Sequence, residues 1–322
     1  MLAAYVSSLQ PQDPLAGLTV GERPEPAAPP GWARVQVRAA ALNHHDLFSL
    51  RGVGLPEDRL PMILGCDASG VTDDGREVVV HSVISSPGWQ GEATLDPGRS
   101  LLSEVHQGTL AEQVVVPESN LVDKPTELSH EEAACLPTAW LTAYKMLHVG
   151  AGVTPGATVL VQGAGGGVAT AALQIGRATG YRMWATSRSS QRRSRALEIG
   201  ADAAFEPGER LPERVDAVLE TVGAATWAHS LRSLRPGGTV VLSGATTGDE
   251  VGRAGFAHIF FRQLRVVGAT MGNREQLGRV LELARVTGVR PVIDRVLPLS
   301  RAADGLAALA AGEVFGKVVL VP

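Results

Sequence analysis

The residues with the clearest capacity for chemistry lie together near position 45. His44, His45 and Asp46 directly follow residues 32–42, an apolar run whose pattern is typical of a strand. Two imidazoles and a carboxylate can hold a metal ion or pass a proton. Adjacent residues of a strand point to opposite faces, so the two imidazoles do not converge easily on one ion. The cluster therefore favours proton transfer, or a polar lining, over a metal site.

A glycine-rich turn offers a second kind of chemistry, the binding of a phosphate. The stretch TVLVQGAGGGVATAALQIGRATGYRMWATS reads as strand, turn, helix and strand, the order of a βαβ unit. Glycines let the backbone approach a pyrophosphate, and the helix N-terminus points its N–H groups at it. The turn reads AxGxxA, which weakens the match to the GxGxxG dinucleotide pattern, and a turn without a ligand is the alternative. The cofactor contacts expected here are Ala164, Gly165, Gly166, Gly167 and Val168.

The end of the second strand favours NADPH over NADH. NAD sites usually place a carboxylate about 20 residues after the glycines, but residues 186–193 read TSRSSQRR, without an acid. Arg188 and Arg192, helped by Ser187, can bind a 2′-phosphate through charge-assisted hydrogen bonds. No Asp or Glu occurs from position 133 to 197, which supports an anionic ligand in this region. The other interpretation of these arginines is a solvated helix face.

Two patterns of secondary structure must position these residues. The N-terminal part alternates short strand-like runs with Pro/Gly turns, which indicates a mostly-β unit. Ser129 and Glu132 then form a capping-box pattern, and from there strands and helices alternate. Such alternation predicts a parallel sheet with helices on both faces. The C-terminal tail returns to β patterning and is expected to close onto the first unit.

Composition excludes several classes of protein. Of the 322 residues, 44% are hydrophobic and 19% charged, which describes an ordinary globular chain. No apolar run approaches the about 18 residues that span a bilayer, and a net charge of −4 gives no general attraction for nucleic acid or membrane. The two cysteines, Cys66 and Cys135, form neither a disulfide framework nor a structural zinc motif. We expect a cytoplasmic protein with no nucleic-acid or membrane partner.

Motifs along nearly the whole chain resemble those of the medium-chain dehydrogenase/reductase superfamily. They are AAALNHHDLFSLRG, PMILGCDASGV, GTLAEQVVVPESNLVDKP, EEAACLPTAWLTAYKML, VLVQGAGGGVATAALQIGRATG, ALEIGAD and GKVVLV. Within it, the chain is similar to the quinone oxidoreductase-like branch, often labelled zinc-type alcohol dehydrogenase-like. The resemblance implies an α/β fold, with a doubly wound Rossmann NADP(H)-binding domain (123–290) inserted in a GroES-like, mostly-β catalytic domain (1–122 and 291–322). It also implies a homodimer, joined through the strand LRVVGAT.

The resemblance also bears on metal binding. By position, zinc-dependent members have Cys, His, Glu and Cys where this chain has Asn43, Cys66, Asp67 and Thr138. An amide, a thiol, a short carboxylate and a hydroxyl do not supply the three firm ligands of a catalytic zinc, so we expect no metal. The cysteine-rich lobe that holds a structural zinc is also missing, because residues 85–100 contain no Cys.

Matching positions imply the roles of the remaining residues. His44 resembles the residue that faces the cofactor pyrophosphate. His45 resembles the Ser/Thr of the proton relay and is the candidate proton donor, or else a lining residue. The Asn43 amide and the Thr138 hydroxyl can donate to a developing enolate oxygen, or merely satisfy buried backbone. Further cofactor contacts are expected at Thr142, Thr221, Val222, Gly223, Ser243, Gly244, Ala245, Met271 and Gly272.

Three residues near this site are expected to stay outside the chemistry. Asp46 is interpreted as a structural carboxylate bonded to backbone. Lys317 is interpreted as a surface lysine close to the C-terminus, with a further contact to the cofactor as the alternative. Cys66 is interpreted as a small apolar group rather than a thiolate, because nothing in the sequence lowers its pKa.

The expected absence of a metal limits the substrates. A zinc ion stabilises charge on a reacting oxygen, and without it the acceptor must stabilise charge by its own conjugation. The sequence therefore predicts NADPH-dependent hydride transfer to a small quinone, an enone or another activated alkene. Two alternatives remain, an alcohol or aldehyde dehydrogenase of the same fold and a non-catalytic NADPH-binding protein.

Overall fold

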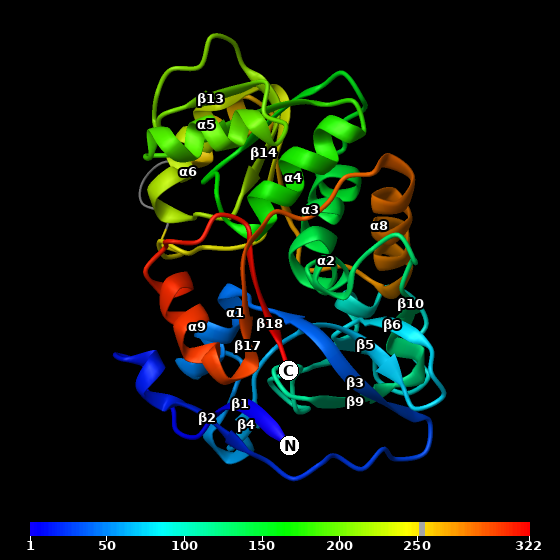
Figure 1. The fold of residues 1–322 in the computed structure, drawn as a ribbon. Coiled ribbons are helices and arrows are strands. Elements are labelled where there is room, and N and C mark those ends of the chain that lie inside the picture. The colour runs from blue at the N-terminus through cyan, green and yellow to red at the C-terminus, as the bar shows by residue number, and fades with distance from the viewer. Residues whose placement is uncertain (251–254) are drawn as a thin grey trace. The chain divides into compact units, whose positions relative to one another are not determined.

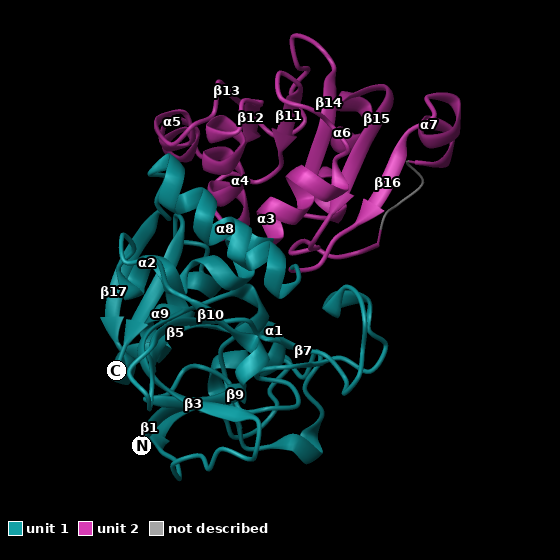
Figure 2. Ribbon diagram, turned by 90° about the vertical axis from the view of Figure 1, so that its right-hand side faces the viewer, with its two compact units in different colours: residues 1–141, 272–322 teal, residues 142–271 magenta. Residues whose placement is uncertain are grey.

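The strands of the protein fall into two groups from different parts of the chain. In the computed structural model, residues 1–250 and 255–322 are described. Unit 1 comprises residues 1–141 and 272–322, and unit 2 comprises residues 142–271 (Figure 2). Each unit has its own sheet and its own cluster of buried apolar side chains.

Unit 1 is built mainly from antiparallel strands contributed by both ends of the chain (Figure 1). They are β1 (Leu2–Val6), β2 (Leu18–Glu22), β3 (Trp32–Ala41), β4 (Met62–Ile63), β5 (Asp67–Thr72), β6 (Glu77–Val80), β7 (Val83–Ile84), β8 (Ser100–Leu101), β9 (Gln113–Pro117), β10 (Leu121–Asp123), β17 (Ile293–Pro298) and β18 (Lys317–Val321). The largest sheet has the order β10-β6-β5-β3-β18-β17, with β9 also paired to β3. The C-terminal strands thus complete the sheet of the N-terminal ones.

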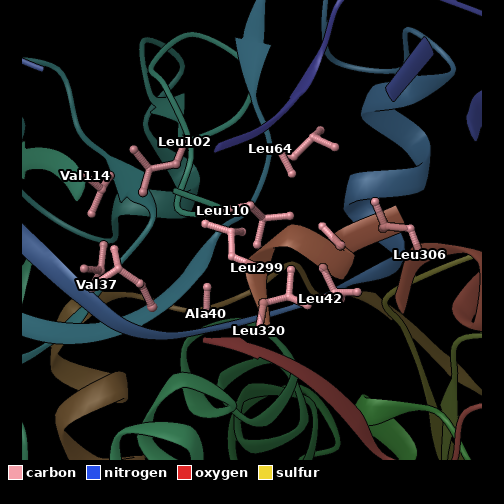
Figure 3. Close-up of a cluster of buried hydrophobic side chains, with 14 of the residues drawn as sticks. Val37, Ala40, Leu42, Leu64, Leu102, Leu110, Val114, Leu299, Leu306 and Leu320 are labelled. Atoms are coloured by element: carbon pink, nitrogen blue, oxygen red, sulfur yellow. The ribbon is translucent and has the colours of Figure 1, made fainter. Parts of the chain in front are cut away.

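The core of unit 1 lies against this sheet. Val37 and Ala40 of β3 pack with Leu320 of β18 and with Leu306, from a helix near the C-terminus (Figure 3). Leu306 and Leu320 are completely buried, and Val37 and Ala40 are almost completely buried. Because these contacts join segments far apart in sequence, the two chain ends cannot separate without exposing apolar surface to water.

Most helices of unit 1 are short, but α8 has 14 residues. They are α1 (His44–Leu50), α2 (His130–Ala134), α8 (Arg274–Thr287) and α9 (Ala302–Ala310), with the π-helical segment η5 (Leu136–Trp140) and the 3₁₀ segments η1 (Pro14–Gly17), η2 (Glu57–Arg59), η3 (Ala93–Leu95), η4 (Glu118–Asn120) and η7 (Leu299–Arg301). The start of α1 corrects the sequence interpretation, which places His44 and His45 on a strand. Asn43 is the N-cap, and the Asp46 carboxylate accepts from its backbone N–H. This reciprocal cap favours a helix from His44 onward.

Unit 2 contains one parallel sheet of six strands. They are β11 (Thr158–Val161), β12 (Arg182–Thr186), β13 (Ala203–Phe205), β14 (Val215–Glu220), β15 (Leu234–Leu242) and β16 (Arg265–Gly268), in the order β13-β12-β11-β14-β15-β16. Its helices are α4 (Gly167–Ala178), α5 (Ser190–Glu198), α6 (Ala224–Ser233) and α7 (Phe256–Phe261), while α3 (Leu141–Lys145) and the π-helical η6 (Met146–Gly150) lead into it. The predicted α/β fold with a doubly wound Rossmann sheet is confirmed.

The boundaries between the two units differ from those of the predicted domains, which comprise residues 1–122, 123–290 and 291–322. Helix α2 packs against β3 and β5, and α8 packs against η5 and β10, so both helices belong to unit 1. An alternating pattern of strands and helices does not reveal on which sheet a terminal helix packs, and this is why the predicted boundaries differ. Within the described part of the chain, every helix is too short or too polar to cross a bilayer.

Candidate functional site

Asp46 holds the start of α1 against the segment that precedes β5. Its Oδ2 accepts a hydrogen bond from the Asn43 N–H at 2.8 Å, and its Oδ1 accepts one from the Gly65 N–H at 3.0 Å. The side chain is fully buried, and this burial raises the pKa of the Asp46 carboxyl to about 6. Asp46 is therefore a structural carboxylate bonded to backbone, as expected from the sequence.

A buried ion pair joins the last strand to these N-terminal residues. The Lys317 Nζ lies 3.2 Å from Asp67 Oδ2, and it donates to Asn43 Oδ1 at 2.6 Å and to the Leu42 carbonyl at 2.7 Å. The Asn43 amide in turn donates to Asp67 Oδ2 at 2.8 Å. Lys317 is 3% exposed, so its interpretation as a surface lysine is wrong. It begins β18, an inner strand of the sheet, and therefore has neighbours on both sides.

Thr138 lies in the π-helical segment η5, which packs against β5. Its hydroxyl oxygen is buried and has no hydrogen-bond partner. Leaving a buried hydroxyl unpaired costs about 1–3 kcal/mol, and π-helical turns are frequent at functional sites. The hydroxyl thus has no partner in the described part of the chain, whereas the Asn43 amide is bonded within the protein.

His45 lies between a carboxylate and a thiol. Its Nε2 is 2.8 Å from Glu104 Oε1, while its Nδ1 is 3.5 Å from Cys66 Sγ and 3.4 Å from Ser103 Oγ. Burial lowers the pKa of His45, but the Cys66 sulfur, the Glu104 carboxylate and nearby Asp46 together raise this pKa well above its usual value. These neighbours therefore favour the charged form of the ring, and both ring nitrogens have polar partners. His44, the next residue, is exposed.

In unit 2, the glycine-rich turn links β11 to α4. Gly163 and Gly165 have φ values of 77° and 128°, which glycine adopts without strain. The Ala164 N–H donates to the Thr186 carbonyl at 2.7 Å, which ties the turn to the end of β12. Helix α4 begins at Gly167, and its first N–H groups have no acceptor within the helix. Such a terminus is suited to a pyrophosphate.

The predicted 2′-phosphate site lies beside this turn. A Cβ atom on Gly165 would come within 3.1 Å of the Arg192 Nη1, so the guanidinium lies next to the turn. Arg188 follows β12 and is exposed. Arg193, in contrast, donates to the Ser187 carbonyl at 2.7 Å and so fixes the backbone. Two of the arginines are thus placed where an anion could approach, and the third is structural.

A buried polar network supports the neighbouring loops. Gln162 accepts from the Thr186 hydroxyl at 2.6 Å and donates to Ser230 Oγ at 3.0 Å. Ser230 in turn donates to Glu220 Oε2 at 2.6 Å, and Glu220 Oε1 accepts from both N–H groups of residues 222–223 at 2.8 and 3.1 Å. Because fully satisfied buried networks are rigid, this one holds the loops after β11, β12 and β14 in place.

The structure brings several of the other predicted cofactor residues together. A Cβ on Gly163 would lie 2.6 Å from Val222, and one on Gly223 would lie 2.8 Å from the Cα of Ala245. The loops that carry Thr221 to Gly223 and Ser243 to Ala245 are therefore in close contact. Thr142 is buried, and Met271 has a φ of 41° just before the chain re-enters unit 1. There, the Gly272 carbonyl accepts from His81 at 2.8 Å.

Comparison with known proteins identifies the family. Residues 29–126 match the alcohol dehydrogenase GroES-like domain, and residues 167–285 match the zinc-binding dehydrogenase family. The chain is 31% identical to the zinc-type alcohol dehydrogenase-like protein YogA of Leptosphaeria maculans, over 92% of each protein. The chain belongs to the medium-chain dehydrogenase/reductase superfamily.

Other members of this superfamily are similar over the full length. The acryloyl-coenzyme A reductase of Metallosphaera sedula is 29% identical, over 94% of this chain and 96% of that protein. A crystal structure of an NAD-dependent alcohol dehydrogenase is 36% identical, with a TM-score of 0.92 and complete coverage of both chains. The protein is accordingly an NAD(P)-dependent oxidoreductase of the superfamily.

The residues of this superfamily member do not fit the zinc that the name of the matched family implies. Asn43 and Asp67 already bind the Lys317 ammonium, and a second cation there would be strongly repelled. The Cys66 thiol faces His45, and the Thr138 hydroxyl is a weak neutral ligand. Among the described residues, no three His, Cys, Asp or Glu side chains are arranged to hold a metal ion. These donors differ from the ligand sets of catalytic zinc.

Two residues of the site, Ser103 and Glu104, have no sequence signal, and the sequence interpretation places a third, Lys317, at the surface. Glu104 and Ser103 lie in a loop without a motif, and they reach His45 only because the chain folds back over 59 and 58 positions. Lys317 has a weak signal, since a lysine that opens the apolar run KVVLV marks a strand with a charge at its start. Its burial could be expected only if β18 were known to be an inner strand.

Replacing Lys317 by Met should leave the Asp67 carboxylate buried without its cation. We expect the free energy of unfolding to fall by about 3–5 kcal/mol, measured by urea denaturation. The double variant Lys317→Met/Asp67→Asn removes both charges and should regain most of the loss. Arg279→Met, which breaks an exposed helix pair with Glu275, serves as a control and should change stability by less than about 1 kcal/mol. A double variant no more stable than the single one would contradict this account.

The protonation of His45 can be measured directly. We expect NMR titration of ¹⁵N-labelled histidine to give this ring a midpoint above 6.5, because Cys66, Glu104 and Asp46 favour its charged form. Since the folded-state pKa exceeds the unfolded value of about 6.5, the charged ring stabilises the fold fully below that pH. The contribution is lost as the pH rises through the folded-state pKa. His45→Gln should assign the signal, and a midpoint at or below 6.5 would refute the assignment of an imidazolium.

Proposed function

We propose that this protein is an NADPH-dependent, zinc-free reductase of quinones, enones or other activated alkenes, in the quinone oxidoreductase-like branch of its superfamily. The buried Lys317 ammonium carries this proposal. It occupies the acceptors, Asn43 and Asp67, at positions where zinc-dependent members have metal ligands. Without a Lewis acid on the reacting oxygen, the acceptor must itself delocalise the charge that hydride addition creates.

The residues of unit 1 have distinct roles in this proposal. His45 donates a proton to the reduced acceptor, because its surroundings raise its pKa and so favour the charged, proton-donating form of the ring. The Thr138 hydroxyl, which has no partner within the protein, donates a hydrogen bond to the developing enolate oxygen. Asn43 acts indirectly, since its amide orients Asp67 and Lys317. A bound reduced nicotinamide would supply a hydride. Together with the proton from His45, this hydride completes the two-electron reduction of the acceptor.

The residues of unit 2 would hold the cofactor through its phosphates. The turn between β11 and α4 suits the pyrophosphate, and His44, exposed at the start of α1, is proposed as a further contact to it. Arg192 and Arg188 are proposed to bind the 2′-phosphate, supported by the position of Arg192 beside Gly165. The loops at 221–223 and 243–245, with Thr142, Met271 and Gly272, are proposed as the remaining contacts.

A second candidate keeps the fold but changes the substrate. The likeness to an NAD-dependent alcohol dehydrogenase favours oxidation of alcohols or reduction of aldehydes with NADH. The likeness to an acryloyl-coenzyme A reductase favours an activated alkene, because an acryloyl group has a conjugated carbon–carbon double bond. We prefer the activated alkene because the donors around Lys317 do not suit a metal.

The first experiment compares acceptors under anaerobic conditions. Oxidation of NADPH and NADH is followed with 1,4-benzoquinone, methyl vinyl ketone and hexanal, with and without EDTA. We expect NADPH to reduce the quinone or the enone at a rate that EDTA does not change. Turnover of hexanal alone, abolished by EDTA, would show the alcohol dehydrogenase alternative to be correct. Binding of NADPH without any turnover would favour a non-catalytic role.

The cofactor assignment has its own test. Replacing Arg192 or Arg188 by Ala should raise the KM for NADPH about tenfold or more, because each removes a charge-assisted hydrogen bond to the 2′-phosphate. The KM for NADH should stay unchanged. Arg210→Ala removes the same charge from an exposed position before β14 and is the matched control. If the NADPH KM is unaltered in both variants, the assignment of NADPH is wrong.

We also propose a homodimer formed through β16, the last strand of the sheet in unit 2. Val266 of β16 is 43% exposed, and Phe260 of the preceding α7 is 60% exposed. An open sheet edge beside apolar side chains can pair with a second copy across a two-fold axis.

Light scattering should therefore give twice the chain mass of 33.7 kDa for the wild type. The double variant Val266→Asp/Phe260→Asp should give the mass of a single chain, because it places charges in the proposed interface. Val286→Asp, at an exposed position of α8 in unit 1, is the control and should remain dimeric. A monomeric wild type would eliminate the proposed dimer.

A further inference from the structure

We propose that Glu104 is a positioning residue for proton transfer by His45. It anchors one ring nitrogen, Nε2, and so turns the other, Nδ1, toward Cys66 and Ser103. The catalytic part of this inference rests on the proposed reductase function. The geometric part does not, because it concerns the protein without substrate.

The two sides of the His45 ring differ in the strength of their contacts. The Nε2 to Glu104 distance of 2.8 Å is that of a charge-assisted hydrogen bond. The contacts of Nδ1, 3.5 Å to Cys66 Sγ and 3.4 Å to Ser103 Oγ, are longer and weaker. The Cys66 thiol itself points to the Leu102 carbonyl, 3.4 Å away. The proton on Nδ1 is therefore the one that the ring can release.

The loop that carries Glu104 has an unusual backbone. Ser103 has a φ of 63° and is fully buried, a conformation that non-glycine residues rarely adopt. Its N–H donates to the His106 carbonyl at 2.8 Å, and the loop follows directly on β8. Such conformations persist only where the surroundings enforce them, and they cluster at functional sites. Here the strained residue precedes Glu104 and contacts His45 itself.

Gly54 lies directly against the Glu104 carboxylate. A Cβ atom at this position would come within 2.5 Å of Glu104 Oε1, and the Gly54 φ is 78°. A side chain here would have to displace the carboxylate that holds His45. The position of Glu104 is thus determined from two sides, by the Ser103 backbone and by the space that Gly54 leaves.

These contacts define a balanced proton step. A bound reduced nicotinamide would supply a hydride to the acceptor, and the Nδ1 proton of His45 would pass to the resulting enolate. The ring is left neutral, with its remaining proton on Nε2 bonded to Glu104. A solvent proton restores the imidazolium after the product leaves. The Glu104 side chain is 26% exposed, so it reaches water while it holds the ring.

Two variants test Glu104 without removing His45. Glu104→Gln keeps the shape but loses the charge, and Glu104→Asp keeps the charge but shortens the reach. With NADPH and methyl vinyl ketone, we expect kcat to fall about 10²-fold in Glu104→Gln, in the range of general acid catalysis. We expect a smaller fall in Glu104→Asp and an unchanged KM for NADPH in both. A purely structural role would not separate kcat from KM in this way.

Gly54→Ala displaces Glu104 while every polar group of the cluster remains. Its control is Gly75→Ala, because Gly75 has a similar φ of 86° but nothing within 4 Å of an added Cβ. Both variants bear a similar backbone strain, so a larger loss of kcat in Gly54→Ala is expected to come from the displaced carboxylate. Equal kcat in the two variants would count against the proposal.

Histidine NMR of the substrate-free protein separates this inference from the proposed function. In the wild type, ¹⁵N spectra at pH 7.5 should show both His45 nitrogens protonated, and Glu104→Gln and Gly54→Ala should shift the ring toward its neutral form. The groups that face the ring besides Glu104 are Cys66 and Asp46, and both remain in these variants. An unchanged His45 spectrum in Glu104→Gln would overturn the proposal. Altered spectra in a protein that reduces no acceptor would overturn only the reductase function.

Discussion

The buried pair of Lys317 and Asp67 is the constraint on which unit 1 depends. Lys317 begins β18 and Asp67 begins β5, and both strands flank β3 in the sheet. Removing two charges from water costs several kcal/mol for each ion, in order of magnitude. Within the described part of the chain Asp67 Oδ1 has no hydrogen-bond partner, so the pair depends on the partners of Asp67 Oδ2 and Lys317 Nζ. Asn43 and Leu42, just after β3, supply those partners. The pair thus fixes three strands in register at the point where α1 begins.

The position of the chemistry follows from this register. Because α1 starts immediately after β3, the residue that caps it is also the residue that binds the ammonium. His45 is then the second residue of the helix, next to the segment that leads into β5. The Lys317 ammonium supplies a positive charge at a fixed position. Unlike a catalytic metal ion, it has no open coordination site that could bind a substrate oxygen. Protonation by a side chain becomes correspondingly more important.

Local patterns predicted much of the molecule because they depend on residues close in sequence. The βαβ unit around Gly165 and five of the strands of the parallel sheet follow from periodicity and turn residues, whereas the short β13 has no such signal. The same reasoning failed where two local preferences competed. His44 and His45 follow closely on an apolar run typical of a strand, yet the Asp46 cap begins a helix there. It also failed for α2 and α8, whose packing partners no pattern reveals.

The sequence by itself determined the fold class, the superfamily, the glycine turn and the arginines beside it, since each is written in a short contiguous stretch. Only the tertiary structure decided that Lys317 is buried against Asp67, 250 positions away, and that Glu104 holds His45 across 59 positions. Such pairs depend on strand order, register and loop conformation. These features are set by the packing of the whole unit. The sequence around one residue of such a pair therefore does not reveal which residue is its partner.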